Sequence, residues 1–108
     1  MQGFDPEYEK NIERSLEWFS KKTGYLVGEE EFKQIDLMGL RRIFGITDSF
    51  VLPEGMTALE YDAAGYDPYM IYCYAVDEKK AKELQKYVKH KIKVDKYNYK
   101  VGAASRSS

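Results

Sequence analysis

No basic side chain occurs between Arg42 and Lys79. This interval of 36 residues holds seven acidic residues and five tyrosines. The polarity then reverses: residues 1–77 contain 7 basic and 15 acidic side chains, whereas residues 78–108 contain 10 and 3. The formal net charge of −1 therefore hides a strongly dipolar chain. Such a charge asymmetry indicates a charged partner and says little about the fold.

Cysteine and histidine are scarce as well, because Cys73 and His90 are the only ones. A single cysteine excludes an internal disulfide and fits a reducing compartment. Metal centres and acid–base sites usually combine histidine with Cys, Asp or Glu at set spacings, and neither such a combination nor a phosphate-binding glycine loop is present. We therefore predict no enzyme activity, no cofactor and no metal ion. His90 is interpreted as a structural residue near a helix end, and Cys73 as a packed, unreactive thiol.

The sequence also lacks an apolar run of the roughly 20 residues that cross a bilayer. Residues 1–9 are acidic and polar, unlike a signal peptide, so we expect a cytoplasmic protein that does not bind membranes. With 108 residues, of which 44% are apolar, the chain can bury one modest core. We predict a single domain over residues 1–101. Residues 102–108 have the composition of a flexible tail, or of residues added during cloning.

Capping residues and turns divide the chain into elements. Asp36 and Asp77 can each accept hydrogen bonds at the start of a helix, and Thr57 with Glu60 has the spacing of a capping box. The run from Tyr69 to Val76 is apolar and aromatic without alternation, which predicts a central strand covered on both faces. We expect helices over residues 36–44, 58–64 and 77–90, and strands over residues 69–76 and 92–101.

Residues 5–19 allow two interpretations. Asp5 followed by Pro6 is typical of a helix start, and apolar residues then recur at helical spacing up to Phe19. Two aromatic and branched runs on either side of Lys21–Gly24 instead predict a β-hairpin. Periodicity alone does not decide between them.

The tyrosines of the interval without basic residues are the strongest functional signal. Tyrosine supplies a large contact area and a hydroxyl group at low entropic cost, and acidic neighbours accelerate the encounter with a basic partner. The alternative is that the tyrosines fill the core and that isolated acids such as Glu60 and Asp62 only keep the surface soluble. Our candidate partner-binding residues are Glu60, Tyr61, Asp62, Tyr66, Asp67 and Tyr69.

The lysine-rich C-terminal third supports a competing hypothesis. Lysines recur along the predicted helix over residues 77–90 and beyond it, and a basic patch of this size can bind nucleic acid by counterion release. Arginine, which binds phosphate through a planar fork, is almost absent from this region, so a solvated helix face is the simpler interpretation. A third hypothesis is a homo-oligomer in which the acidic half of one copy contacts the basic half of the next.

Four segments of the chain resemble, in order, a family of small bacterial domains without assigned chemistry. They are Glu17–Glu29, Leu40–Ile46, Tyr72–Val76 and the stretch from Tyr87 to Tyr99. Such domains occur among the immunity proteins of contact-dependent growth inhibition and other polymorphic toxin systems. The resemblance implies strand over residues 12–20 and an α+β fold, in which an antiparallel sheet packs with two or three helices. Residues 46–69 depart from the family pattern, so the resemblance implies no residue roles there.

Together these observations lead to the hypothesis of an immunity protein that binds a cognate C-terminal toxin domain, with a nuclease as the expected class. The acidic, tyrosine-bearing face would cover a cationic groove that otherwise binds phosphates. Nucleic acid and a second copy of the chain are the alternative partners. The hypothesis requires that the interval without basic residues faces solvent and is not neutralised by the C-terminal lysines.

Overall fold

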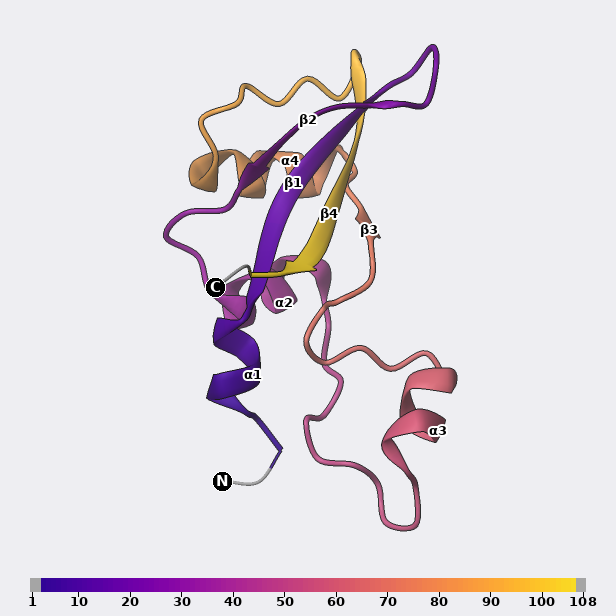
Figure 1. Cartoon of the computed structure of the whole chain (residues 1–108). Helices are drawn as coiled ribbons and strands as arrows, with labels where there is room; N and C mark the ends of the chain where they lie inside the picture. The colour runs from indigo at the N-terminus through magenta and orange to yellow at the C-terminus, as the bar shows by residue number, and fades with distance from the viewer. Residues whose placement is uncertain (1–2, 107–108) are drawn as a thin grey trace.

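The computed structural model describes residues 3–106, in which short helices and strands alternate along the chain (Figure 1). In chain order they are α1 (Pro6–Lys10), β1 (Ile12–Ser20), β2 (Leu26–Glu31), α2 (Leu37–Phe44), α3 (Ala58–Ala63), β3 (Tyr74–Ala75), α4 (Glu78–Leu84), the 3-10 helix η1 (Gln85–Tyr87) and β4 (Tyr97–Ser105). The strands form one antiparallel sheet, which confirms the predicted α+β class.

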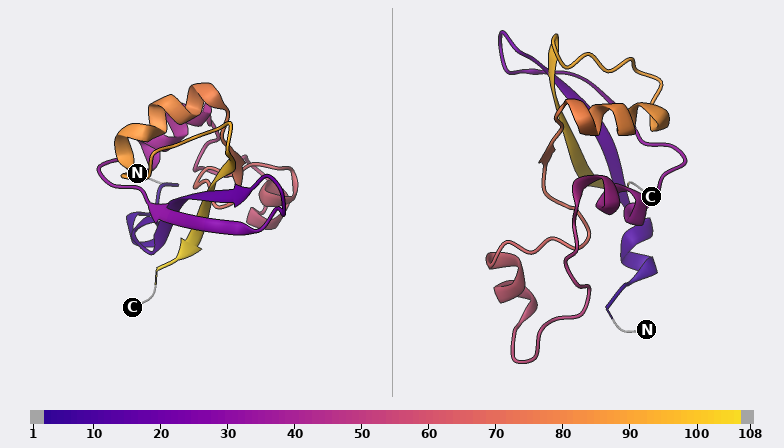
Figure 2. Two further views of the ribbon diagram at one scale, coloured as in Figure 1. Left: turned by 90° about the horizontal axis from the view of Figure 1, so that it is seen from above. Right: turned by 180° about the vertical axis from the view of Figure 1, so that it is seen from behind.

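The sheet has the strand order β2-β1-β4-β3. Its longest pairing joins β1 and β4, from Ile12 opposite Ser105 to Ser20 opposite Tyr97. Side chains alternate between the two faces of a strand, so Leu16 points to the same face as the residues two positions before and after it. Helices α2 and α4 both cover this face, as the view from behind in Figure 2 shows. The core therefore forms on one side of the sheet.

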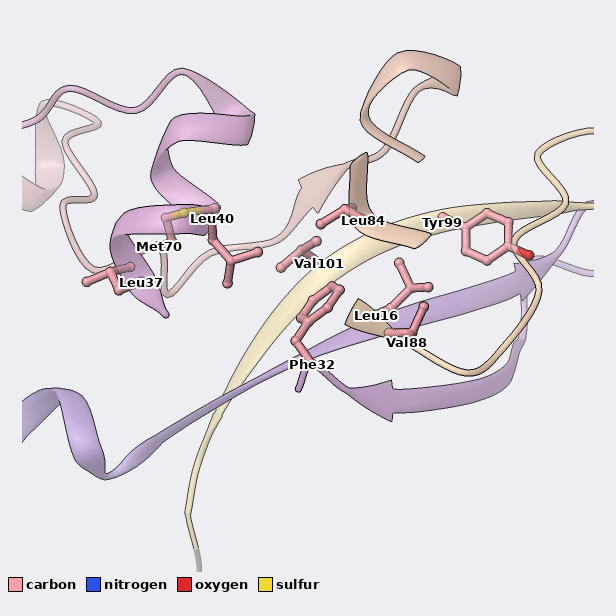
Figure 3. Packing of buried hydrophobic residues seen from close by; sticks show 9 residues of the cluster. All are labelled: Leu16, Phe32, Leu37, Leu40, Met70, Leu84, Val88, Tyr99 and Val101. Atoms are coloured by element: carbon pink, nitrogen blue, oxygen red, sulfur yellow. The ribbon is translucent and has the colours of Figure 1, made fainter. Parts of the chain in front are cut away.

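Aliphatic side chains from the sheet and from both helices fill this core (Figure 3). Leu16 of β1 lies opposite Val101 of β4, and both are fully buried. Leu40 from α2 and Leu84 from α4 pack into the same cluster. Burial of one such side chain contributes about 1.5–3 kcal/mol. The amphipathic stripes of the two helices thus fix how they lie on the sheet.

The N-terminal segment is helix first and strand afterwards. The Asp5 carboxylate accepts hydrogen bonds from the backbone nitrogens of Glu7 (3.0 Å) and Tyr8 (3.3 Å) and so caps α1, which ends at Lys10. From Ile12 onward the backbone pairs with β2 on one side and β4 on the other. The helical spacing of apolar residues beyond Lys10 is overridden by these ladders, because they satisfy the backbone along both edges of β1.

The expected central strand over residues 69–76 is wrong. Only the two residues of β3 are extended and paired, and β3 lies at the edge of the sheet beside β4. The backbone before β3 turns around the carboxylate of Asp67, which accepts hydrogen bonds from the nitrogens of Ile71 and Tyr72 at 3.0 Å each. A backbone bonded to a side chain in this way does not join a sheet ladder. For the same reason Cys73 is exposed, contrary to the packed thiol that we expected.

The predicted helix over residues 77–90 also ends early. Helix α4 stops at Leu84 and continues as η1 for one tight turn. The carboxylate of Glu30, on β2, accepts hydrogen bonds from the backbone nitrogens of Lys89 (2.6 Å) and His90 (2.8 Å). These bonds hold the chain out of helical register and lower the pKa of Glu30. A contact from a strand distant in the sequence thus ends the helix.

The last strand lies further along the chain than predicted. Residues 94–96 form a turn, so β4 begins at Tyr97 and not at residue 92. The strand continues to Ser105, and residues 102–105 therefore belong to the sheet and not to a tail. Gly102 of this strand is buried, and a larger residue would not fit there without a shift of Glu17, because a Cβ atom would lie 2.6 Å from its carboxylate oxygen. Residues 107 and 108 lie outside the described part of the chain.

The ring of His90 packs against side chains of the strands β1 and β4. Its ring stacks on Trp18 with ring centroids 3.7 Å apart and an interplanar angle of 9°. Its Nε2 atom lies 2.8 Å from the hydroxyl oxygen of Tyr99, which accepts a hydrogen bond from the backbone nitrogen of Lys93 at 2.9 Å. A neutral imidazole with its proton on Nδ1 accepts the Tyr99 hydroxyl proton at Nε2 in this arrangement. Burial lowers the pKa of His90.

We expect this histidine to make the protein less stable in mild acid. Because the pKa is lower in the folded than in the unfolded chain, the unfolded state binds the proton first as the pH falls through about 6.5. Between pH 7.5 and pH 5 the wild type should lose at most about 1 kcal/mol more than His90→Phe, since solvent screens a partly exposed group. Urea unfolding of both proteins at the two pH values measures this difference. Equal losses would show that His90 does not titrate with folding.

A large part of the chain lies away from the sheet. Residues 47–72, named the lobe below, extend beyond α2 and carry α3 at their outer end (Figure 1). The molecule measures 46 × 28 × 26 Å, and its radius of gyration is 15.0 Å. A compact chain of this length has a radius of gyration of roughly 13 Å. The projecting lobe accounts for the difference, and it contains all six candidate partner-binding residues.

Candidate functional site

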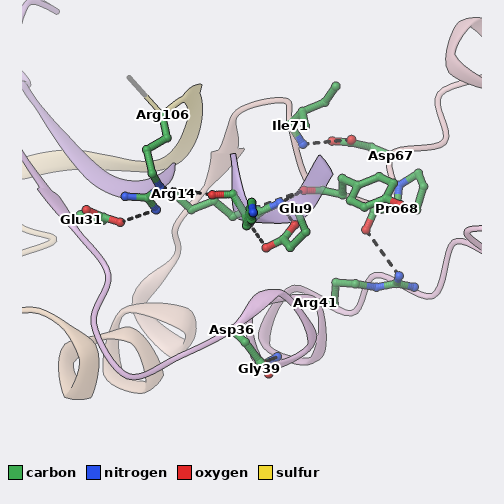
Figure 4. A network of polar contacts seen from close by, with 12 residues as sticks. Glu9, Arg14, Glu31, Asp36, Gly39, Arg41, Asp67, Pro68, Ile71 and Arg106 are labelled. Atoms are coloured by element: carbon green, nitrogen blue, oxygen red, sulfur yellow. Dashed lines mark hydrogen bonds and ion pairs between the residues drawn. The ribbon is translucent and has the colours of Figure 1, made fainter. Parts of the chain in front are cut away.

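Arg41 of α2 holds the base of the lobe. It is 9% exposed, and its guanidinium donates hydrogen bonds to the carbonyl oxygens of Asp48 (2.6 Å), Ile46 (3.3 Å) and Pro68 (3.4 Å). Figure 4 shows the bond to Pro68. The same group lies over the ring of Phe50, 4.5 Å from its centroid. One buried cation thus joins the segment that enters the lobe to the segment that leaves it.

Asp67 binds the segment that leaves the lobe through a buried carboxylate, which accepts hydrogen bonds where Arg41 donates them. It is 5% exposed and accepts hydrogen bonds from the nitrogens of Ile71 and Tyr72 and from the hydroxyl of Tyr74 (2.5 Å). Its own backbone nitrogen donates to the carboxylate of Asp48 at 2.8 Å. Burial, together with the hydrogen bond to Asp67, raises the pKa of Tyr74 and keeps this hydroxyl a donor. Asp67 therefore organises the lobe from inside.

Tyr69 attaches the N-terminal segment to the lobe. Its hydroxyl accepts a hydrogen bond from the backbone nitrogen of Asp5 (2.8 Å) and donates one to the carbonyl of Gly3 (3.2 Å). Its carbonyl accepts from the Nε atom of Arg14 at 3.2 Å. Arg14 is buried and forms a two-pronged ion pair with Glu9, at 2.7 and 2.9 Å (Figure 4). Both ends of Tyr69 are thus occupied within the protein.

Tyr61 and Tyr66 form a stacked pair at the outer end of the lobe. Their ring centroids lie 4.5 Å apart with an interplanar angle of 9°. Tyr61 is 7% exposed, its hydroxyl donates to the carbonyl of Ser49 at 2.7 Å, and burial raises its pKa. Tyr66 is 44% exposed. Tyr61 therefore supports Tyr66, and only Tyr66 presents an aromatic surface to solvent.

Glu60 and Asp62 carry exposed carboxylates on α3. Glu60 completes the predicted capping box: its carboxylate accepts from the nitrogen of Thr57 at 2.9 Å, and its own nitrogen donates to the Thr57 hydroxyl at 3.1 Å. These bonds lower the pKa of Glu60 and keep it ionised. Asp62 accepts a hydrogen bond from the hydroxyl of Tyr72, which raises the pKa of Tyr72. Two negative charges thus stand on the outer helix.

The six predicted residues therefore divide into two groups of three. Glu60, Asp62 and Tyr66 lie on the surface of the lobe. Tyr61 and Asp67 are buried and Tyr69 is partly buried, and all three hold the lobe together. The expectation that Asp67 is displayed to solvent is wrong, because a carboxylate that accepts two backbone bonds and one hydroxyl bond faces inward.

Sequence reasoning missed the apolar side chains of the same surface. Leu59 is 79% exposed, and Leu52, Ile71 and Tyr72 are also exposed. Tyr8 of α1 adds a half-exposed ring beside them. One signal was available for Leu59: it is a large aliphatic residue two positions after the capping Thr57 of a short helix and two positions before Tyr61. Apolar groups gathered in this way mark an interaction surface.

The negative charge of the lobe is not neutralised inside the protein. The lobe contains five acids and no basic residue. Among residues 3–106, none of these five carboxylates forms an ion pair. The C-terminal lysines that could have paired with them lie on α4, on η1, in the loop after it and on β4. Within the interval without basic residues, Glu60 and Asp62 are therefore exposed and unpaired among the described residues, whereas Asp67 is buried and Asp77 pairs with Lys80 at 3.1 Å.

Other kinds of site find little support in the described part of the chain. No three His, Cys, Asp or Glu side chains of residues 3–106 gather as metal ligands would. The helices described are all too short or too polar to cross a membrane. Every buried side-chain nitrogen or oxygen in this part has a hydrogen-bond partner.

Comparison with known proteins identifies the family. A family model described as Domain of unknown function (DUF7683) matches residues 13–52 and 61–102, which together are most of the chain. No curated protein matches the sequence. Residues 53–60, which carry the exposed Leu59 and Glu60 of the lobe, fall between the two matched segments. The chain therefore belongs to the family of the Domain of unknown function (DUF7683).

Proposed function

We propose that this protein is a non-enzymatic immunity protein, which binds a cognate bacterial toxin domain through its lobe and thereby blocks the toxin. One observation carries the proposal: the lobe projects from the sheet and combines exposed apolar side chains with unpaired carboxylates and no basic group. Isolated apolar residues are ordinary on a surface, but a projecting group of them rimmed by one sign of charge is typical of a docking face.

The surface chemistry suits a basic partner. Leu59 and Tyr66 supply apolar contact area, while Glu60 and Asp62 attract cationic groups and repel acidic proteins. A nuclease domain carries such cationic groups where it binds phosphates, so covering them would compete with its substrate. For this reason a nuclease is the toxin class that we favour.

The internal bonds of the lobe serve the same function. Arg41 and Asp67 fix the segments that enter and leave the lobe, and Tyr61 supports the exposed Tyr66 from below. A surface that is ordered before binding loses less conformational entropy on association. Asp67 and Tyr61, which we expected to contact the partner, therefore contribute to affinity indirectly by holding the lobe in place.

The decisive experiment is co-expression with the C-terminal domain of a candidate toxin found in the adjacent reading frame. We expect the wild type to protect cells and to bind the purified toxin domain. Glu54→Lys with Glu60→Lys should slow association about tenfold at low salt, and the effect should shrink as salt screens it. Glu29→Lys with Asp95→Lys is the matched control, because both residues are exposed and lie outside the lobe. Circular dichroism of each variant checks that the fold is intact.

Three results would contradict the proposal. The toxin domain could fail to bind, the two double variants could slow association equally, or neither could slow it. Tight binding of nucleic acid, lost on replacing Lys79, Lys82, Lys86 and Lys89, would instead favour the lysine-rich face as the functional surface. That alternative has one observation behind it: Lys79, Lys82 and Lys89 form no ion pair within residues 3–106.

A further inference from the structure

A groove of about 330 Å³ runs between α1 and the lobe. Aromatic rings dominate its walls, and one exposed carboxylate stands at its edge; these residues are Tyr8, Phe50, Tyr61, Tyr66, Tyr69 and Asp62. Its size is at the lower end of pockets that hold small molecules, which corresponds to one large side chain and not to a cofactor.

Two of the rings have open faces. Tyr66 stacks on Tyr61 with one face only, and it is 44% exposed, so its other face is free. Tyr8 packs edge to face against Tyr69, with ring centroids 4.8 Å apart, and is 45% exposed. An open aromatic face attracts a cation placed over it. Phe50 already takes part in such a contact, because the guanidinium of Arg41 lies over its ring.

The charges around the groove favour the same kind of ligand. Asp62 lines the groove, while Glu60 lies about 160° away around α3, so Asp62 is the acid of the two that faces it. Asp67 also lines the groove, but its carboxylate already accepts three hydrogen bonds. The lining residues include no basic side chain. Arg41, whose guanidinium lies over the Phe50 ring, is buried and already donates to three carbonyls. The groove therefore offers aromatic faces and an exposed carboxylate with no basic side chain in its lining.

We infer that this groove holds the guanidinium group of an arginine side chain supplied by the partner protein. The guanidinium would stack on the free face of Tyr66 while its N–H groups donate to the carboxylate of Asp62. Arginine suits this geometry better than lysine, because its planar group stacks on rings and donates in a fork. The Asp62 carboxylate already accepts the Tyr72 hydroxyl at one oxygen, and an apolar side chain would leave its negative charge without a cation. The inference rests on the proposed function, since it names the group of the toxin that the lobe recognises.

The inference can be tested on the intact chain without a partner. The probes are N-acetyl-arginine methylamide and N-acetyl-citrulline methylamide, which have nearly the same shape and differ in charge. Two-dimensional NMR should show saturable shifts of the Tyr8, Asp62 and Tyr66 resonances with the arginine probe. The citrulline probe should bind at least about tenfold more weakly, as expected from loss of a cation–π contact and a charge-assisted bond.

Substitutions then locate the site. Tyr66→Leu and Asp62→Asn should each weaken the arginine probe about tenfold. Tyr25→Leu and Glu29→Gln are the controls: Tyr25 is a more exposed tyrosine in the β1–β2 turn, and Glu29 is an exposed acid outside the lobe. Equal binding of both probes, shifts centred outside the groove, or binding that survives Tyr66→Leu would each overturn the inference. Absence of any saturable arginine shift would overturn it as well.

Failure of this inference is distinguishable from failure of the proposed function. If the toxin domain binds the lobe but Tyr66→Leu and Asp62→Asn leave the affinity unchanged, the arginine groove is wrong and the immunity function stands. If the groove binds the arginine probe but no toxin domain is bound or blocked, the groove is real and the immunity function is wrong.

Discussion

Asp67→Ala is expected to lower the free energy of unfolding by about 3 kcal/mol, because it leaves buried donors without an acceptor. Three donors lose their partner at once: the backbone nitrogens of Ile71 and Tyr72 and the hydroxyl of Tyr74. Asp67→Asn keeps the shape and one acceptor oxygen, so it should cost about half as much. Urea unfolding followed by circular dichroism measures both losses.

Asp62→Ala is the matched control for this prediction. Asp62 belongs to the same lobe, but its carboxylate is exposed and accepts only the hydroxyl of Tyr72. Its removal should change the stability by less than about 0.5 kcal/mol. Hydrogen exchange adds a local readout, since Asp67→Ala should expose the amides of Ile71 and Tyr72. An Asp67→Ala variant as stable as Asp62→Ala would mean that water replaces the carboxylate and that the lobe is held by other contacts.

Arg41→Met is expected to lower the free energy of unfolding by a similar amount, again about 3 kcal/mol. Methionine keeps the apolar stem of the side chain, and the loss therefore reports on the guanidinium alone. That group donates to three backbone carbonyls and lies over Phe50, and bonds to a charged donor contribute about 1.5–3 kcal/mol each in favourable cases. Arg41→Lys should recover only part of the loss, since one ammonium group cannot reach three carbonyls in a planar fork.

The neighbouring arginine provides the control. Arg42 is exposed on the same helix, and Arg42→Met removes the same charge without a buried contact. We expect a change below about 0.5 kcal/mol for it. If Arg41→Met and Arg42→Met are equally stable, the buried guanidinium is not what joins the two ends of the lobe. If only Arg41→Met is unstable, it should also bind the toxin domain more weakly, because its docking face is no longer ordered before binding.

Asp67 and Tyr61 also explain why only half of the candidate site was predicted correctly from the sequence. Asp67 and Tyr61 belong by sequence to an acidic, tyrosine-rich interval, as Glu60 and Tyr66 do. Nothing in the local pattern separates a carboxylate that faces solvent from one that accepts backbone bonds within its own turn. Burial separates them, and burial depends on where Arg41 and Phe50 lie in three dimensions.

The sequence alone determined the features that depend on neighbouring residues. The capping groups of Asp36, Thr57 and Asp77 begin helices where predicted. Charge segregation is likewise a property of the sequence. These features are local, because a cap or a turn forms bonds within a few residues.

Only the tertiary structure decided the features that depend on distant partners. The apolar run over residues 69–76 became a turn and a short edge strand because its backbone is bound by side chains: Arg14 of β1 donates to the carbonyl of Tyr69, and Asp67 accepts from the nitrogens of Ile71 and Tyr72. The helix after Asp77 ends early because Glu30 binds the nitrogens of Lys89 and His90. In both places a side chain distant in the sequence, Arg14 or Glu30, binds backbone groups that a regular element would otherwise have paired. Hydrogen bonds between distant segments leave no periodic trace in the sequence, so their outcome is visible only in the folded chain.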